Sequence, residues 1–166
     1  MKVSDHQNYL KLERFKRFQE KLFDHRRNSL ADYFSLNKKE SVKILIVDDE
    51  KIHQLTLSSQ LRRLGYHPEI ANNGREALAM FSGTHYNIVF MDVEMPIVDG
   101  IEATKRILEI KQHRPVIIGH TTLDTPQCYQ LCTNAGMTTV LQKPANEDTI
   151  KGLMEKISKP FSVNKR

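Results

Sequence analysis

The fold is decided by the stretch Ile44-Leu45-Ile46-Val47-Asp48-Asp49, in which four consecutive apolar residues run into an acidic pair. A short apolar run followed by polar residues is typical of a strand that is buried on both faces of a sheet. Working outward from it, the sequence predicts five such strands, at 42–47, 66–71, 87–91, 116–119 and 138–141.

Amphipathic stretches separate these strands, and each has helical spacing. The predicted helices span 52–64, 75–81, 100–111, 125–135 and 146–157. In the first of them the spacing places Leu55, Leu61 and Leu64 on one side, and Gly136 is expected to cap the fourth. Strict alternation of strand and helix favours parallel pairing through right-handed crossovers. The predicted class is therefore α/β, a doubly wound five-stranded parallel sheet with five helices.

Residues 1–41 have a different pattern, with no strand candidate and no Gly or Pro. They predict a charged N-terminal helical extension and a polar linker, followed by the main domain at 42–160 and a tail at 161–166. The extension carries ten basic and six acidic residues. This mild excess is expected to be a solvated face, so no nucleic-acid partner is expected. The apolar stripe of the helix suggests packing on a partner, either as a homodimer, back on the domain, or on another protein.

Composition and hydropathy argue against a membrane span. No apolar run reaches the length of a membrane span, and the N-terminus lacks the apolar core of a secretion signal. We expect a cytoplasmic protein without a membrane span.

The residues that follow the strands carry the chemistry. Ligands of an open parallel sheet bind beyond the carboxyl ends of its strands. Asp48 and Asp49 follow the first strand, Asp92 the third, Thr121 the fourth and Lys143 the fifth. A single aspartate at a strand end is often only a helix cap, but the whole set at one sheet edge is hard to explain that way.

Such a cluster suits phosphoryl chemistry. Clustered carboxylates repel one another, and a hard divalent cation such as Mg²⁺ relieves that repulsion. Lys143 supplies a point charge and Thr121 a hydroxyl donor for phosphoryl oxygens. Asp92 is then the natural nucleophile, and a carboxylate that attacks phosphorus forms an aspartyl phosphate.

Four segments also carry a family resemblance. The segments Ile44–Glu50, Met91–Gly100, Ile117–Thr121 and Lys143-Pro144 resemble, in order and spacing, the signatures of response-regulator receiver domains of two-component signalling. The Met-Pro-x-x-Asp-Gly segment most resembles receivers of hybrid kinases and phosphorelays. The resemblance covers residues 42–160 and implies a CheY-like sheet of strand order 2-1-3-4-5.

The resemblance further implies a role for each site residue. Asp92 would be the phosphoacceptor, and Asp48, Asp49, Asp92 and the backbone carbonyl of Glu94 would hold Mg²⁺. Lys143 and Thr121 would contact the phosphoryl group. The implied partners are a histidine kinase or a histidine phosphotransfer protein and a protein output target. The protein would then be a single-domain phosphoprotein switch rather than an enzyme that turns over an external substrate, acting through protein–protein contact or phosphorelay signal transduction.

Some positions depart from the family pattern. Val140 stands where an aromatic switch residue is common, and Thr122 stands where a small residue is usual. One extra residue between Pro115 and Thr121 leaves Thr122 as the alternative switch position.

Other readings remain open. The missing aromatic keeps a phosphorylation-independent interaction module as the alternative, and a phosphatase-type hydrolase would need a second aspartate where Glu94 stands. Among the histidines, His120 is predicted to pack in the core or at the rim of the site. His53 is predicted to lie near the rim of the pocket and to face solvent, with an effect on metal affinity as the alternative.

Overall fold

A computed structural model describes residues 42–110 and 114–158, and these form the α/β architecture that the sequence predicts. The element bounds, in chain order, are β1 Ile44–Val47, α3 Lys51–Arg63, β2 Glu69–Ala71, α4 Gly74–Phe81, β3 Ile88–Met91, α5 Gly100–Glu109, β4 Val116–Thr121, α6 Pro126–Ala135, β5 Thr139–Gln142 and α7 Glu147–Ser158. The N-terminal helical extension, its linker, its proposed dimer contact and the tail lie outside the described residues. The domain boundaries at 41/42 and 160/161 stay predictions.

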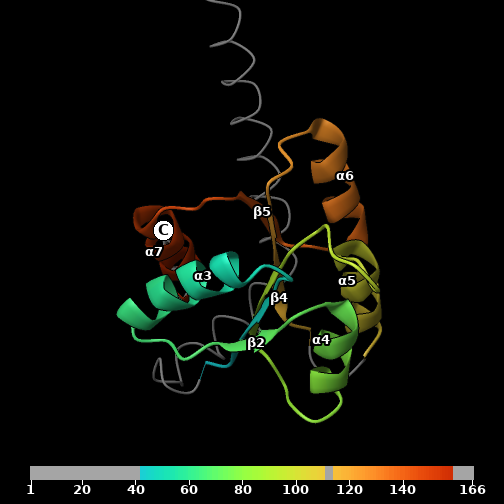
Figure 1. Cartoon of the computed structure of the whole chain (residues 1–166), viewed down its shortest axis with the longest axis horizontal. Helices are drawn as coiled ribbons and strands as arrows, with labels where there is room; N and C mark the ends of the chain where they lie inside the picture. The colour runs from blue at the N-terminus through green and yellow to red at the C-terminus, as the bar shows by residue number, and fades with distance from the viewer. Residues whose placement is uncertain (1–41, 111–113, 159–166) are drawn as a thin grey trace, which may run out of the picture. The chain divides into compact units, whose positions relative to one another are not determined.

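The sheet has five parallel strands in the order β2-β1-β3-β4-β5, which confirms the predicted topology. Figure 1 shows α3 and α7 on one side of this sheet and α4, α5 and α6 on the other. Every residue of β1, β3 and β4 is buried, because helices cover both faces.

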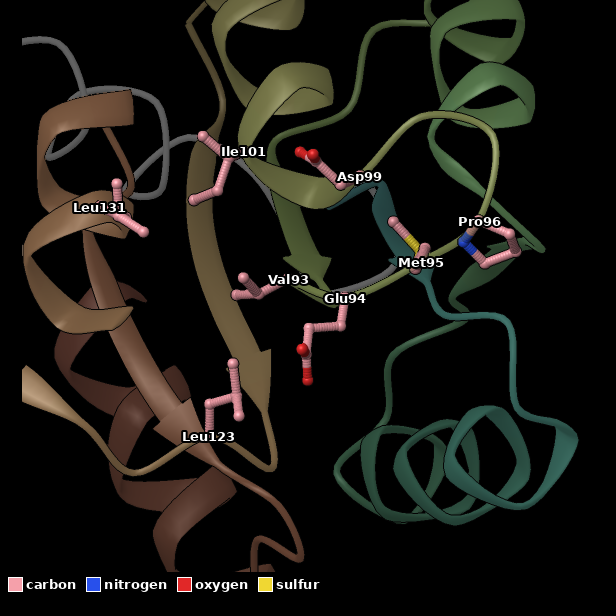
Figure 2. A pocket seen from close by; sticks show the side chains of 8 residues that line it. All are labelled: Val93, Glu94, Met95, Pro96, Asp99, Ile101, Leu123 and Leu131. Carbon is pink, nitrogen blue, oxygen red and sulfur yellow. The ribbon is translucent and has the colours of Figure 1, made fainter. Parts of the chain in front are cut away.

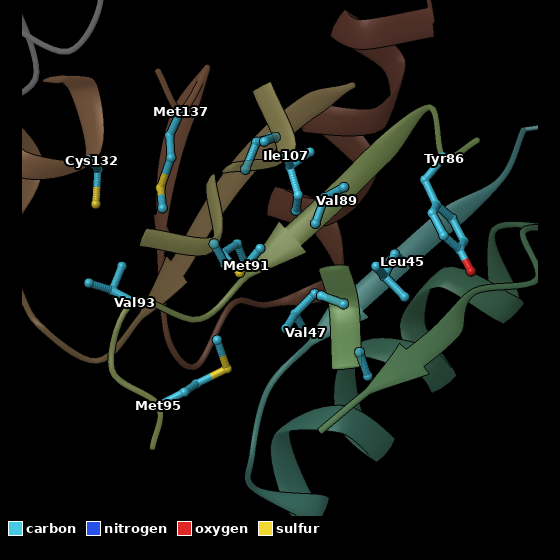
Figure 3. Close-up of a cluster of buried hydrophobic side chains, with 14 of the residues drawn as sticks. Leu45, Val47, Tyr86, Val89, Met91, Val93, Met95, Ile107, Cys132 and Met137 are labelled. Atoms are coloured by element: carbon cyan, nitrogen blue, oxygen red, sulfur yellow. The ribbon is translucent and has the colours of Figure 1, made fainter. Parts of the chain in front are cut away.

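One face of the sheet carries a large apolar cluster (Figure 3). Alternate strand residues such as Leu45, Val47, Val89 and Met91 pack there against α4, α5 and α6, because successive side chains of a strand point to opposite faces. Leu57 and Leu61 of α3 are buried, and so are residues of α7. This two-sided core holds the carboxyl ends of β1, β3, β4 and β5 at one edge.

The cap of α6 follows the predicted rule. The side chain of Thr125 accepts a hydrogen bond from the backbone N–H of Cys128, Pro126 occupies the first turn, and Gly136 ends the helix in a left-handed conformation with φ of 98°. The glycine cap turns the chain directly into β5.

Several predicted details are wrong. Leu55 is 63% exposed, because α3 buries the stripe that contains Gln54, Leu57, Ser58 and Leu61 instead. β4 extends to Thr121, so this residue ends the strand rather than following it. β2 begins only at Glu69, after Gly65 adopts a left-handed conformation, and α5 ends at Glu109.

No helix in the described ranges has the length and apolar character needed to cross a bilayer.

Candidate functional site

The backbone of the sheet brings the predicted acids together. The Asp92 N–H donates to the carbonyl of Val47, and the Asp48 N–H donates to the carbonyl of Ala71, so the segments that follow β1 and β3 continue the sheet side by side. Carboxylate oxygens of Asp48, Asp49 and Asp92 all lie within 4.8 Å of one another. The predicted carboxylate cluster is present, with Asp49 exposed and the other two acids buried.

Lys143 bridges two of these acids. Its Nζ lies 2.6 Å from Asp48 Oδ2 and 2.7 Å from Asp92 Oδ2. The side chains of Lys143, Asp48 and Asp92 are only 3%, 2% and 9% exposed, so the three charges meet almost without water. A buried ammonium between two buried carboxylates neutralises charges that burial would otherwise make costly.

The charge balance of the cluster is that of a divalent-cation site. Three carboxylates and one ammonium leave a formal charge of −2 when all are ionised. Burial raises the pKa of Asp92, the Lys143 ammonium opposes this effect, and the nearby Asp48 carboxylate adds to it. A divalent hard cation that binds the oxygens would cancel the remaining charge and favour the ionised form of Asp92.

Local hydrogen bonds hold the acids in place. Asp48 Oδ1 accepts from the backbone N–H of Glu50 at 2.9 Å, and Asp92 Oδ1 accepts from the backbone N–H of Glu94 at 3.3 Å. The side chain of Gln54 donates to the carbonyl of Asp48 at 2.7 Å. Gln54 therefore ties the start of α3 to the end of β1. Nothing in the sequence indicated this role, because a polar side chain in a helix is normally expected to face solvent.

Thr121 lies next to Lys143 through the backbone. It pairs with Gln142 in the sheet, and its carbonyl accepts from the Lys143 N–H at 2.8 Å. Its side chain is fully buried, and its Oγ1 accepts from the Leu123 N–H at 3.1 Å, whereas Thr122 is exposed. Thr121 is thus buried at the end of β4 and Thr122 is not, and the role of Thr121 toward a phosphoryl group stays a prediction. The peptide bond between Lys143 and Pro144 is cis.

Two histidines border the cluster, as the sequence predicts for both, but the exposure of one of them differs from the prediction. His120 is 6% exposed, as predicted for a packed residue, and its ring meets Phe90 edge-on at 6.4 Å between centroids. The prediction that His53 faces solvent is wrong, because its side chain is only 25% exposed and its Nδ1 lies 3.2 Å from Lys143 Nζ.

A groove of about 500 Å³ lies beside the segment that follows Asp92. It is lined by Val93, Glu94, Met95, Pro96, Asp99, Ile101, Leu123 and Leu131. Figure 2 shows the Glu94 side chain pointing between the segment after β3 and Leu123. The groove contains none of the three clustered acids, so it is a neighbouring surface rather than the cluster's own cavity.

The buried His120 is expected to make stability depend on pH. Burial, and secondly the Lys143 ammonium, lower its pKa to about 4 from an ordinary value near 6.5. The unfolded chain therefore binds a proton that the folded protein excludes, and stability falls as the pH drops through this window. At pH 5 the loss is about 2 kcal/mol relative to pH 8.

Denaturant unfolding of the parent and of His120→Leu at several pH values checks this expectation. Contributions of other groups cancel in the difference between the two proteins, and the exposed His67→Leu serves as the control. If the gap between parent and His120→Leu stayed constant from pH 8 to pH 5, His120 would not be the responsible group.

Comparisons with known proteins agree with this geometry. The sequence model of the response regulator receiver domain matches residues 44–155. The sensor histidine kinase RcsC of Escherichia coli is 38% identical over 117 residues, which are 70% of this chain and 12% of the kinase. Histidine kinase 5 of Arabidopsis thaliana is 33% identical over 134 residues, 74% of this chain and 14% of that protein. The chain thus matches only a small part of each of these kinases.

Solved structures show the same fold. The chemotaxis protein CheY4 of Vibrio cholerae superposes with a TM-score of 0.66 and 32% identity, covering 70% of this chain and 98% of CheY4. The receiver domain of the sensor histidine kinase PA1611 of Pseudomonas aeruginosa, solved with a magnesium ion coordinated in its active-site cleft, gives a TM-score of 0.66 and 27% identity. That match covers 70% of this chain and 97% of the PA1611 domain.

Proposed function

Because this chain belongs to the response regulator receiver domain family, we propose that it is a phosphorylation switch in which Asp92 accepts the phosphoryl group. The observation that carries this proposal is the contact of one buried ammonium, Lys143, with both Asp48 and Asp92 beside Asp49. This arrangement suits transfer of a phosphoryl group onto Asp92, because such transfers are catalysed mainly by positioning and charge neutralisation.

The transfer step balances without further reactants. A carboxylate oxygen of Asp92 attacks the phosphorus of a phosphohistidine, an O–P bond forms, and the P–N bond breaks. The donor imidazole leaves with the electron pair of that bond. Lys143 neutralises one phosphoryl oxygen, and Thr121, whose Oγ1 accepts from the Leu123 N–H, donates its hydroxyl hydrogen to another. These groups lower the barrier by position and charge rather than by forming bonds themselves.

We propose Mg²⁺ as the cation of this site. Asp48, Asp49 and Asp92 supply oxygen ligands of the kind that Mg²⁺ prefers, and the backbone carbonyl of Glu94 would add a fourth. When bound, the cation supplies the charge neutralisation that lets an anionic carboxylate approach an anionic phosphoryl group. The magnesium-bound PA1611 receiver domain supports this choice by analogy.

The proposed phosphodonor is a histidine kinase or a histidine phosphotransfer protein. Both curated relatives described above are histidine kinases. The helix that follows the acid pair also exposes two large apolar side chains one turn apart, Ile52 at 65% and Leu55 at 63%. A donor protein that packs on these residues would bring its histidine to the nearby site. A protein output target would then read the conformational shift that phosphorylation produces.

Intact mass after incubation with a small acyl-phosphate donor and Mg²⁺ tests the proposal. The parent is expected to gain one phosphoryl group, and Asp92→Asn is expected to gain none, because an amide is not a nucleophile at phosphorus. Chelation of Mg²⁺ should slow the uptake strongly, because the carboxylates would then repel the donor.

Asp99→Asn is the matched control for this experiment. Asp99 lies in the same segment, but it is exposed, and it only caps α5 by accepting from the Glu102 N–H, which asparagine also does. It should therefore be phosphorylated like the parent. Equal uptake by Asp92→Asn, or no uptake by the parent, would refute the proposal, and the second result would favour a phosphorylation-independent interaction module.

A further inference from the structure

Lys143 has a third partner that the proposed phosphoryl chemistry does not assign. Its ammonium has three N–H bonds and three neighbours, which are Asp48 Oδ2 at 2.6 Å, Asp92 Oδ2 at 2.7 Å and His53 Nδ1 at 3.2 Å. An ammonium can only donate, so a hydrogen bond between the two side chains requires Nδ1 of His53 to accept, with the ring proton on Nε2. Two anchors of the ammonium are thus carboxylates, and the third is a ring nitrogen.

The three anchors differ in what phosphorylation does to them. In the proposed function, Asp48 binds the cation and Asp92 becomes an acyl phosphate. The contact of each carboxylate with Lys143 therefore changes on phosphorylation. His53 is neither a proposed cation ligand nor a reacting group, and it can keep its contact through the whole step.

From these contacts we propose that His53 is a positioning residue, which holds the Lys143 ammonium in place for the incoming phosphoryl group. This inference rests on the proposed function for its purpose, but the contact itself is a property of the free protein.

The place of His53 in the fold suits this task. It belongs to the first turn of α3, whereas Lys143 follows β5, and 90 residues of sequence separate them. Gln54, the next residue, fixes this turn to the Asp48 carbonyl. The imidazole therefore sits on a rigid helix end and meets the flexible lysine side chain at its charged tip. A lysine has many rotamers, so a fixed acceptor reduces the cost of ordering it for each phosphoryl group.

A competing interpretation is that His53 interacts with the neighbouring carboxylates rather than with the lysine. Its Nδ1 lies 3.5 Å from Asp48 Oδ1 and 3.8 Å from Glu50 Oε2. Both distances are longer than the 3.2 Å to Lys143 Nζ, and both exceed the usual length of an N–H···O hydrogen bond. An ion pair with the acids requires a protonated imidazole, whereas accepting a hydrogen bond from the lysine requires a neutral one. The tests are therefore made at pH 8, where an ordinary imidazole is neutral.

The first test uses beryllofluoride as a phosphoryl mimic, titrated into the full chain with saturating Mg²⁺ at pH 8. His53→Leu removes the acceptor and is expected to weaken beryllofluoride binding about tenfold, which corresponds to 1.4 kcal/mol. His53→Asn places its Oδ1 where Nδ1 stood, so it keeps an acceptor for the ammonium and should restore the affinity to within about threefold of the parent. Mg²⁺ affinity measured without beryllofluoride should stay unchanged in both variants.

His67→Leu is the control, because His67 is an exposed histidine outside the cluster. Binding by His53→Leu at the strength of the parent would overturn the inference. Equal losses in His53→Leu and His53→Asn would also overturn it, because that pattern is what loss of packing alone produces.

The second test does not depend on phosphoryl binding. The ¹⁵N resonance of His53 Nδ1 is measured at pH 8 in the parent and in Lys143→Met. It is expected to move when the donor is removed, and an unchanged resonance would show that the contact does not exist in solution. If the parent binds no beryllofluoride while the resonance moves, the proposed function fails and the contact stands. If the parent is phosphorylated but His53→Leu is unaffected, only the role of His53 fails.

Discussion

Replacing Gly100 with alanine is expected to lower the free energy of unfolding by roughly 3 kcal/mol or more, the upper end of the cost of overpacking. Gly100 is the first residue of α5, and its N–H donates to the carbonyl of Val93 at 3.0 Å. A methyl group there would overlap the carbonyl oxygen of Asp92 and lie 2.8 Å from its carbonyl carbon. The obstructing atoms are backbone, so the segment that carries Asp92 would have to move.

Chemical denaturation measures this effect, and Gly152→Ala provides the control. Gly152 lies inside α7, and a methyl group there meets nothing within 4 Å. Alanine at that position should raise stability by about 0.5–1 kcal/mol, because glycine is a poor helix former. Gly100→Ala with the stability of the parent would show that the close approach of α5 to Asp92 is not rigid.

Replacing Lys143 with methionine is expected to cost about 3–5 kcal/mol in metal-free buffer at pH 7, the usual result of removing one partner from a buried ion pair. Methionine keeps much of the apolar stem but leaves the carboxylates of Asp48 and Asp92 buried without their shared counter-charge. The same loss removes the group that opposes the raised pKa of Asp92, so this carboxylate should accept a proton at higher pH than in the parent.

The sign of the pH dependence follows from that shift. A carboxyl group with a raised pKa in the folded state destabilises the protein where it is ionised, and the penalty disappears as the group takes up a proton. The deficit of Lys143→Met should therefore shrink between pH 7 and pH 5. Mg²⁺ should also reduce it, because the cation replaces the missing positive charge and binds only the folded site.

Lys151→Met is the matched control for the lysine substitution. Lys151 is exposed on α7, and its replacement should change the free energy of unfolding by less than about 0.5 kcal/mol. If Lys143→Met were as stable as Lys151→Met at pH 7 without metal, the buried ion cluster would not hold the sheet edge together.

The alternation of strands and helices, the parallel sheet and the residues of the carboxylate cluster could all be predicted from the amino-acid sequence. The reason is that these features depend on local patterns. Four apolar residues before Asp48 define a buried strand wherever it lies in the sheet, and acids directly after parallel strands must meet at one edge. The family resemblance added the strand order, which the hydrogen-bonded register confirms.

Only the tertiary structure decided which face of α3 is buried and which side chains complete the cluster. The spacing of the leucines predicted that Leu55 is buried, but the buried face of α3 contains Leu57 and Leu61 instead. Polar Gln54 belongs to this face because its side chain donates to the carbonyl of Asp48. The contact of His53 with Lys143 joins residues that are 90 positions apart in the sequence. The spacing of residues within one helix or strand cannot predict such a contact. It depends on where α3 begins and how β5 ends, and therefore on the packing of the whole domain.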